Sequence, residues 1–173
     1  MVKIFVASSN ELEEERKGLA GPVLNLNRWL VDRGAEERVA LEKWEYLDSS
    51  MGVDHKQEEY NRALRACDAA VGLCWRKFGQ YTEQEVTVAR AEIRAVRRVR
   101  RLEVWFKAAA DEEMSAELVS FRGRLAREWS VREKRFSSMN ELRALFTELS
   151  LELLEDEGIP MPDETERKKY GLE

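Results

Sequence analysis

The chain has 173 residues, of which 43% are hydrophobic and 36% are charged, with only 9 glycines and 3 prolines. This length is enough for one ordinary globular domain, and this composition excludes a collagen-like or largely disordered chain. The formal net charge is -5, from 29 Lys and Arg against 34 Asp and Glu, which gives no support to a general nucleic-acid-binding protein.

Membrane, export and metal signals are weak in this sequence. Its apolar runs fall far short of the roughly 20 residues of a membrane helix, and its start, MVKIFVASS, lacks the pattern of a signal peptide. Cys67 and Cys74 stand in apolar surroundings, and His55 is the one histidine. We therefore expect a reduced, cytoplasmic protein with no metal site, no membrane contact and no bound cofactor.

The first third of the chain alternates a strand pattern with a helix pattern. Residues 3–7 predict a strand, which ends at Ser8 and Ser9. A long helix is expected next, with Ser9 or Asn10 as its N-cap, a bend near Gly21 and Pro22, and Gly34 after its end. Its apolar stripe recurs at three- and four-residue steps and comprises Leu12, Leu19, Val23, Leu26 and Leu30.

The same alternation continues to the end of the chain. Residues 69–75 form a continuous apolar run, the pattern of a central strand buried on both faces. Further strands are expected at 39–41, 102–107 and 129–136, and further helices at 57–67, from 82, over 114–125 and over 142–153.

Five strands alternating with five helices are typical of an α/β domain. We predict a flavodoxin-like three-layer sandwich with a five-stranded parallel sheet, in which the first and third strands are central. This domain is expected to span residues 1–157, and the tail 158–173, which contains two prolines, to be loosely ordered.

Binding sites in such sheets lie beyond the carboxyl ends of the strands. The candidate residues are therefore those that follow the strands and those that start the next helix. They are Ser8, Ser9, Trp44, Tyr46, Trp75, Arg76, Lys77, Thr82 and Glu85. No dinucleotide fingerprint, P-loop or nucleophile elbow is present, so these residues do not belong to a typical dehydrogenase, P-loop NTPase or serine hydrolase.

Most of these candidates also have a purely structural interpretation. Thr82 and Glu85 fit a capping box, in which the Glu side chain accepts from the backbone N–H of the cap residue. Ser8 and Ser9 could bind phosphate or ribose hydroxyls, or cap the first helix. Arg76 and Lys77 could pair with a pyrophosphate, or be solvated turn cations. The basic run 94–101 is interpreted as a solvated helix end rather than a nucleic-acid patch.

The chain resembles a family of TIR-like domains of unknown function, which often form the N-terminal domain of signalling ATPases. The resemblance lies in residues 67–89, 2–19 and 102–107. The opening of that family is a strand followed by Ser-Ser and then Leu-x-x-Glu-Arg, which is matched here from Val6 to Arg16. Its central stretch is Cys-Asp, a buried strand, an aromatic-basic-Phe-Gly turn and Thr-x-x-Glu. Those motifs are matched by Cys67-Asp68, the turn 75–79 and the segment 82–85.

This resemblance implies a chemistry, because the wider superfamily includes TIR-type NAD hydrolases and nucleoside deoxyribosyltransferases. Both break an N-glycosidic bond with one Glu at the start of this helix, in the context Glu-x-x-x-Ala. Glu85 followed by Ala89 fits that context, whereas Glu83 is followed by Thr87. The resemblance thus implies hydrolysis of NAD or a related nucleotide, with NAD as substrate and not as cofactor, in bacterial immunity or cell-death signalling.

The chain also departs from its relatives. The loop between Gly79 and Thr82 is short, and the usual tryptophan near the catalytic Glu is missing from its place. Many TIR-like domains are non-catalytic, so a self-association or adaptor module and a nucleotide-sensing domain stand as alternatives. In each case we expect self-association or a signalling partner supplied in trans.

Overall fold

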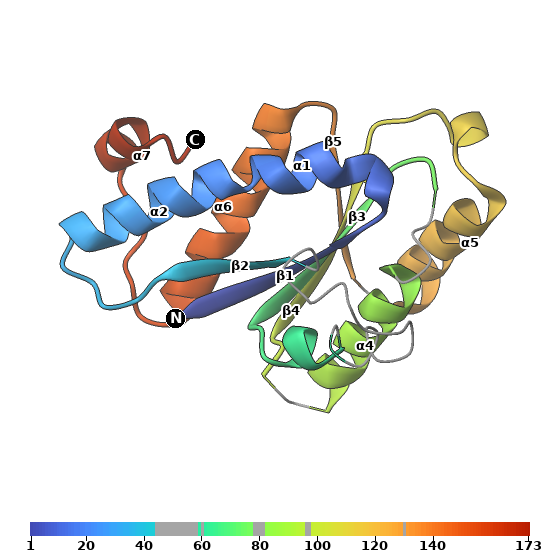
Figure 1. The fold of residues 1–173 in the computed structure, drawn as a ribbon, viewed down its shortest axis with the longest axis horizontal. Coiled ribbons are helices and arrows are strands. Elements are labelled where there is room, and N and C mark those ends of the chain that lie inside the picture. The colour runs from blue at the N-terminus through green and yellow to red at the C-terminus, as the bar shows by residue number, and fades with distance from the viewer. Residues whose placement is uncertain (44–58, 60, 78–81, 96–97, 130) are drawn as a thin grey trace.

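The computed structural model describes residues 1–43, 59, 61–77, 82–95, 98–129 and 131–173. Its centre is a five-stranded sheet in the order β2-β1-β3-β4-β5, in which every neighbouring pair is parallel (Figure 1). The predicted fold class is therefore confirmed, with β3 in the middle and β1 beside it. The strands are β1 (Val2–Ser8), β2 (Val39–Lys43), β3 (Ala69–Cys74), β4 (Arg101–Lys107) and β5 (Arg132–Phe136).

Helices cover both faces of this sheet and complete a three-layer sandwich (Figure 1). One face carries α1 (Glu13–Gly18), α2 (Ala20–Asp32) and α6 (Met139–Asp156), and the other carries α4 (Thr82–Arg94) and α5 (Ala116–Arg124). Three short helical turns are η1 (Asn10–Leu12), η3 (Asp111–Glu113) and η4 (Leu125–Trp129). The described part of the chain contains no helix that is both long and apolar enough to cross a membrane.

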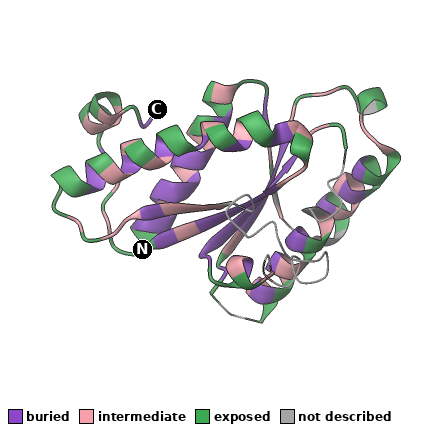
Figure 2. Ribbon diagram, viewed as in Figure 1, coloured by how far each residue is buried: buried purple, intermediate pink, exposed green. Residues whose placement is uncertain are grey.

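The alternation of side chains along the strands gives each face its own apolar core. Ile4, Val71 and Trp105 belong to the core under α1, α2 and α6, whereas Phe5 and Phe106 belong to the core under α4 and α5. All six residues of β3 are buried, as expected for a central strand covered on both faces (Figure 2).

Glycine at position 72 lets α4 approach the sheet closely. A Cβ built on Gly72 would stand 2.9 Å from a methyl carbon of Val86, closer than real Cβ atoms come to other heavy atoms. Gly72 pairs with Ala7 of β1, so the first turn of α4 is held over the β1–β3 pair. This contact places Val86, the residue after Glu85, over the strand pair next to Ala7, one residue before β1 ends at Ser8.

The first helical segment is divided near the predicted bend, but three residues earlier than Pro22. The helix α1 ends at Gly18 and α2 begins at Ala20, with Leu19 buried between them. Pro22 lies in the first turn of α2, where a missing backbone N–H costs no intrahelical hydrogen bond. Gly34 follows α2 with a φ of 71°, the left-handed conformation that favours glycine after a helix.

The tail, expected to be loosely ordered, instead forms a helix docked on the domain, which corrects that expectation. This helix, α7 (Glu164–Tyr170), starts with a capping box made by Asp163 and Glu166 and packs beside α2. Leu172 beyond it has no exposed surface and joins the core under α2 and α6. The buried leucine explains why the tail stays in place.

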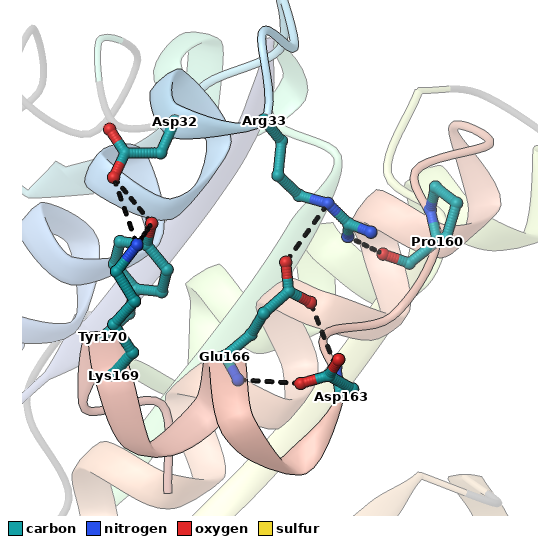
Figure 3. Close-up of polar contacts among 7 residues, drawn as sticks. All are labelled: Asp32, Arg33, Pro160, Asp163, Glu166, Lys169 and Tyr170. Atoms are coloured by element: carbon teal, nitrogen blue, oxygen red, sulfur yellow. Dashed lines mark hydrogen bonds and ion pairs between the residues drawn. The ribbon is translucent and has the colours of Figure 1, made fainter.

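Polar contacts reinforce this docking on the α2 side (Figure 3). Arg33 donates to the carbonyl of Pro160 at 2.7 Å and lies 3.5 Å from a Glu166 oxygen. The Tyr170 hydroxyl donates to Asp32 at 2.6 Å. The tail is therefore part of the folded domain.

The basic run 94–101 is engaged in ion pairs where the structure describes it. Arg98 and Arg100 lie 3.4 and 3.7 Å from Asp68, and Arg100 also lies 2.8 Å from Glu157. Arg101 pairs with Glu152 and Asp156 of α6. These arginines fasten β4 to its neighbours, so the interpretation as a merely solvated helix end is incomplete.

Candidate functional site

The carboxyl edge of the sheet gathers polar and aromatic side chains from three strands. Ser8 ends β1, Trp75 follows β3 and Lys107 ends β4, and these three strands are neighbours. The helix α1 starts above this edge on one face, and α4 starts above it on the other (Figure 1). The edge therefore has the position at which open parallel sheets bind ligands.

Glu85 lies in the first turn of α4 and is 5% exposed. Burial raises the pKa of its carboxyl from 4.5 to about 8, and the positive charge of Arg16 opposes part of that rise. No hydrogen bond or ion pair reaches this carboxyl from the residues that the structure describes, so the reciprocal bond of a capping box is not made there. A buried carboxyl without partners is costly for folding and is characteristic of a functional group.

Arg16 brings a buried positive charge to the same edge. It belongs to α1 and has no exposed surface. Its guanidinium donates to the Ser8 hydroxyl and, at 3.1 Å, to the Ser9 carbonyl. Arg16 is not among the site residues predicted from the sequence, although it ends the Leu-x-x-Glu-Arg motif, which is the signal that points to it.

The two serines after β1 differ in how their hydroxyls are used. The Ser8 hydroxyl accepts from Arg16 and donates to the Ser9 carbonyl at 3.2 Å. Ser9 occupies the N-cap position of η1, but its side chain caps no backbone N–H there. Its buried hydroxyl oxygen has no hydrogen-bond partner among the described residues. Of the two, Ser9 is the one with spare capacity to bind a ligand.

The turn 75–77 after β3 is held rigidly by side chains of neighbouring loops. A carboxylate oxygen of Glu11 accepts the backbone N–H groups of Arg76 at 3.0 Å and Lys77 at 2.9 Å. The Arg76 guanidinium lies 2.7 Å from Glu113 and 4.3 Å from the centre of the Trp75 ring. Trp75 and Arg76 thus form part of the rim of the edge and are engaged with protein groups.

A further ion pair stands on the α1 side of this rim. Lys107 lies 2.6 Å from a carboxylate oxygen of Glu15 and 4.0 Å from the centre of the Trp75 ring. Neither residue is among those predicted from the sequence. Both belong to recognisable positions, since Lys107 ends a predicted strand and Glu15 precedes Arg16 in the opening motif.

Some predicted site residues cannot be placed. Trp44 and Tyr46 lie outside the described residues, and Thr82 is described only as the first residue of α4. Within the described ranges, no three His, Cys, Asp or Glu side chains are grouped to hold a metal ion.

Comparison with known proteins shows the fold and leaves the family open. No protein-family model matches the chain, and no curated protein matches it. A solved structure of the CMP N-glycosidase BcmB from Clostridium botulinum is similar with a TM-score of 0.51 and 15% sequence identity. That similarity covers 83% of this chain and 98% of that one. The flavodiiron core of a Synechocystis protein matches with a TM-score of 0.39, 10% identity and coverages of 82% and 32%.

Proposed function

We propose that this chain is a nucleotide N-glycosidase, which hydrolyses the bond between the base and the C1′ carbon of NAD or a related nucleotide. The observation that carries the proposal is the Glu85 carboxyl, which is buried at the carboxyl edge of the sheet and accepts no hydrogen bond from the described residues. The fold shared with a CMP N-glycosidase over almost its whole length, and the resemblance to TIR-like domains, support the same class of reaction.

One carboxylate is sufficient for the central step. When the C1′–N bond breaks, its electron pair leaves with the base and C1′ becomes an oxocarbenium-like cation. Ionised Glu85 would stabilise this cation or bond to it, and water would then add to C1′ and release a proton. Burial strengthens this interaction, because a carboxylate that is only 5% exposed is little screened by water.

The leaving base decides which protonation state of Glu85 is useful. Nicotinamide leaves NAD as a neutral molecule and needs no acid, so NAD cleavage requires the ionised carboxylate. A positively charged nicotinamide ribose would also favour that ionised form when it binds. A neutral base such as cytosine leaves more easily when it is protonated, and a carboxyl with a pKa of about 8 can supply that proton near neutral pH.

The test is a substrate panel with two matched variants. Purified protein is incubated with NAD, with CMP and with other nucleoside monophosphates, and free base is measured by chromatography over protein concentrations that allow self-association. We expect release of base from at least one nucleotide. Glu85→Gln should reduce turnover at least about 100-fold, since it removes one electrostatic contact to the transition state.

Glu83→Gln is the control, because Glu83 also lies in the first turn of α4 but pairs with Arg124 of α5. It should keep most of the activity. Equal losses in both variants would show that the helix start, rather than one carboxylate, had been damaged. Nucleotide binding without release of base would reject the proposal and favour a nucleotide-sensing domain, whereas neither binding nor release would favour an adaptor module.

A further inference from the structure

A second pocket lies within one helical layer, apart from the candidate site. It is formed by the first half of α2, the first half of α6 and the residues that follow α7, and its volume is about 290 Å³. Glu85 belongs to α4 in the opposite layer (Figure 1). Ligand pockets begin at a volume of about 300 Å³, so this one has the size for a molecule such as a single amino acid and not for a dinucleotide.

Two glycines shape the walls of this pocket. Gly21 on α2 has no side chain, and a Cβ built there would meet no non-neighbouring heavy atom within 4 Å, so the space beside it is open. Gly171, with a φ of 63°, turns the chain after α7, and its carbonyl accepts from the Asn25 side-chain amide at 3.3 Å. The pocket therefore depends on the docked tail.

The helix α6 contributes a polar face with one buried hydroxyl. Asn140, Arg143 and Thr147 follow one another at three- and four-residue steps and all line the pocket. Thr147 is 2% exposed, and its hydroxyl makes no hydrogen bond to any group that the structure describes. Ser150 in the same helix, which is also buried, donates to the Phe146 carbonyl at 2.7 Å. Because a buried hydroxyl without a partner costs stability, Thr147 points to a partner supplied by a ligand.

Two opposite charges line the pocket without pairing. Arg143 donates from Nε to the Gly18 carbonyl at 3.2 Å, and its two terminal nitrogens contact no acceptor among the described residues. Glu173 lines the pocket from the tail, and within the same residues its carboxylate has no cation as a partner. An anion alone would meet Glu173 and a cation alone would meet Arg143, whereas a ligand with both charges would satisfy both residues.

We propose that this pocket binds a small zwitterion of the amino-acid class. The ligand carboxylate accepts from the Arg143 guanidinium, whose planar fork matches a carboxylate, and from the Thr147 hydroxyl. The ligand ammonium donates to the Glu173 carboxylate. Asn25 and Asn140 supply amide groups for the remaining polar atoms. The site is independent of the proposed function, because none of these residues belongs to the carboxyl edge of the sheet.

The experiment is an NMR titration of the full chain labelled with nitrogen-15. Free amino acids are added one at a time at millimolar concentration, with acetate and methylammonium as probes that carry one charge each. We expect at least one amino acid to give saturable shifts of the backbone amides that line the pocket, and acetate and methylammonium to bind at least about tenfold more weakly. The amides to follow are those of Asn25, Asn140, Arg143 and Thr147.

Three variants show whether the named side chains hold the ligand. Thr147→Val keeps the shape and removes the hydroxyl, so the melting temperature should stay equal or rise while the affinity falls at least about tenfold. Arg143→Gln should weaken binding at least as much, because it removes the guanidinium fork. Arg28→Gln is the control, since Arg28 is exposed on α2 and does not line the pocket, and its affinity should equal that of wild type.

Four results would overturn this inference. The first is that no amino acid shifts these amides, and the second is that Thr147→Val and Arg143→Gln both bind as wild type does. The third is equal binding of acetate and of the amino acid, which would reject a zwitterion as the ligand. The fourth is a clearly lower melting temperature of Thr147→Val without ligand, because it would show that the hydroxyl already has a partner within the protein.

Discussion

Two buried carboxylates in different regions of the molecule differ in the hydrogen-bond and ion-pair partners that they have among the described residues. Glu103 lies inside the sheet on β4 and is 1% exposed; it accepts the indole N–H of Trp105 at 2.6 Å and lies 3.0 Å from the Lys134 ammonium. Glu85 lies at the carboxyl edge, is 5% exposed, and accepts no hydrogen bond from the described residues. Through its Oε2 the first carboxylate has both a hydrogen-bond donor and a cation, whereas the second has neither among the described residues.

This difference indicates where the protein gives up stability. Asp68 and Glu92, two further buried carboxylates, also have partners, since Asp68 accepts the backbone N–H of Lys3 at 2.8 Å and Glu92 lies 3.0 Å from Arg65. Among the described residues, Glu85 departs from this pattern at the edge where parallel sheets bind ligands. A carboxyl that accepts no hydrogen bond from them has lone pairs available to a substrate, which is the property that the proposed reaction needs.

The most severe way to test the comparison is to place another unpartnered carboxylate inside the sheet. Val71 is fully buried on β3 and lies opposite Glu103 in the register. Val71→Asp should prevent folding, because a buried charge without a partner costs several kcal/mol and would stand beside a second carboxylate. Circular dichroism and thermal melting measure this effect. Leu24→Asp, at a position 62% exposed on α2, is the control and should fold normally.

A second test compares the stability of wild type and Glu85→Gln as the pH rises. Because the pKa of Glu85 is raised to about 8 in the folded state, from 4.5, the folded protein holds this proton more strongly than the unfolded chain does. Its contribution is complete below about pH 4.5 and is lost as the pH rises through 8.

Wild type should therefore lose stability relative to Glu85→Gln over that window, on the order of 5 kcal/mol in total. Urea denaturation at pH 5, 7 and 9 measures the difference. A constant difference across the three pH values would show that Glu85 ionises normally and would remove the contrast with Glu103.

A third test removes the charge of the satisfied carboxylate. Glu103→Gln should lower the free energy of unfolding by about 2 kcal/mol, because Lys134 loses its ion-pair partner while Trp105 keeps an acceptor. The double variant Glu103→Gln with Lys134→Met should recover part of this loss, which denaturant titration of the four proteins can measure. The proposed glycosidase activity should be unaffected by this change, and a loss of that activity without a loss of stability would contradict the structural role of Glu103.

The smallest effect is expected at a carboxylate on the surface. Glu13 is half exposed and lies 2.7 Å from Lys17 one helical turn later. Exposed pairs of this kind contribute little, since water screens both charges. Glu13→Gln should leave the melting temperature unchanged within error at moderate salt, and a fall as large as that of Glu103→Gln would show that burial does not separate these carboxylates.

Much of the fold could be predicted because it depends on local periodicity. The continuous apolar run at β3 and the three- and four-residue stripes of the helices report burial directly, and alternation of strands with helices admits few topologies. The docked tail was missed. Its capping box, Asp163 with Glu166, is visible in the sequence. A helix this short is stable only when tertiary contacts hold it, and here Leu172 is buried in a core formed mainly by residues far away in the sequence.

The sequence by itself therefore determined the sheet, the helix layers and the position of the candidate carboxylate after β3. The tertiary structure decided that Glu85 is buried and accepts no hydrogen bond from the described residues. It also brought Arg16 of α1 to the Ser8 hydroxyl at the end of β1. On the rim, it stacked Arg76 and Lys107 on the Trp75 ring and paired Arg76 with Glu113. The physical reason is that periodicity records which side of an element is apolar, whereas the ionisation of a carboxyl depends on the water and charges around it. Those surroundings come from segments about 70 residues apart in the chain and exist only once the sheet has brought them together.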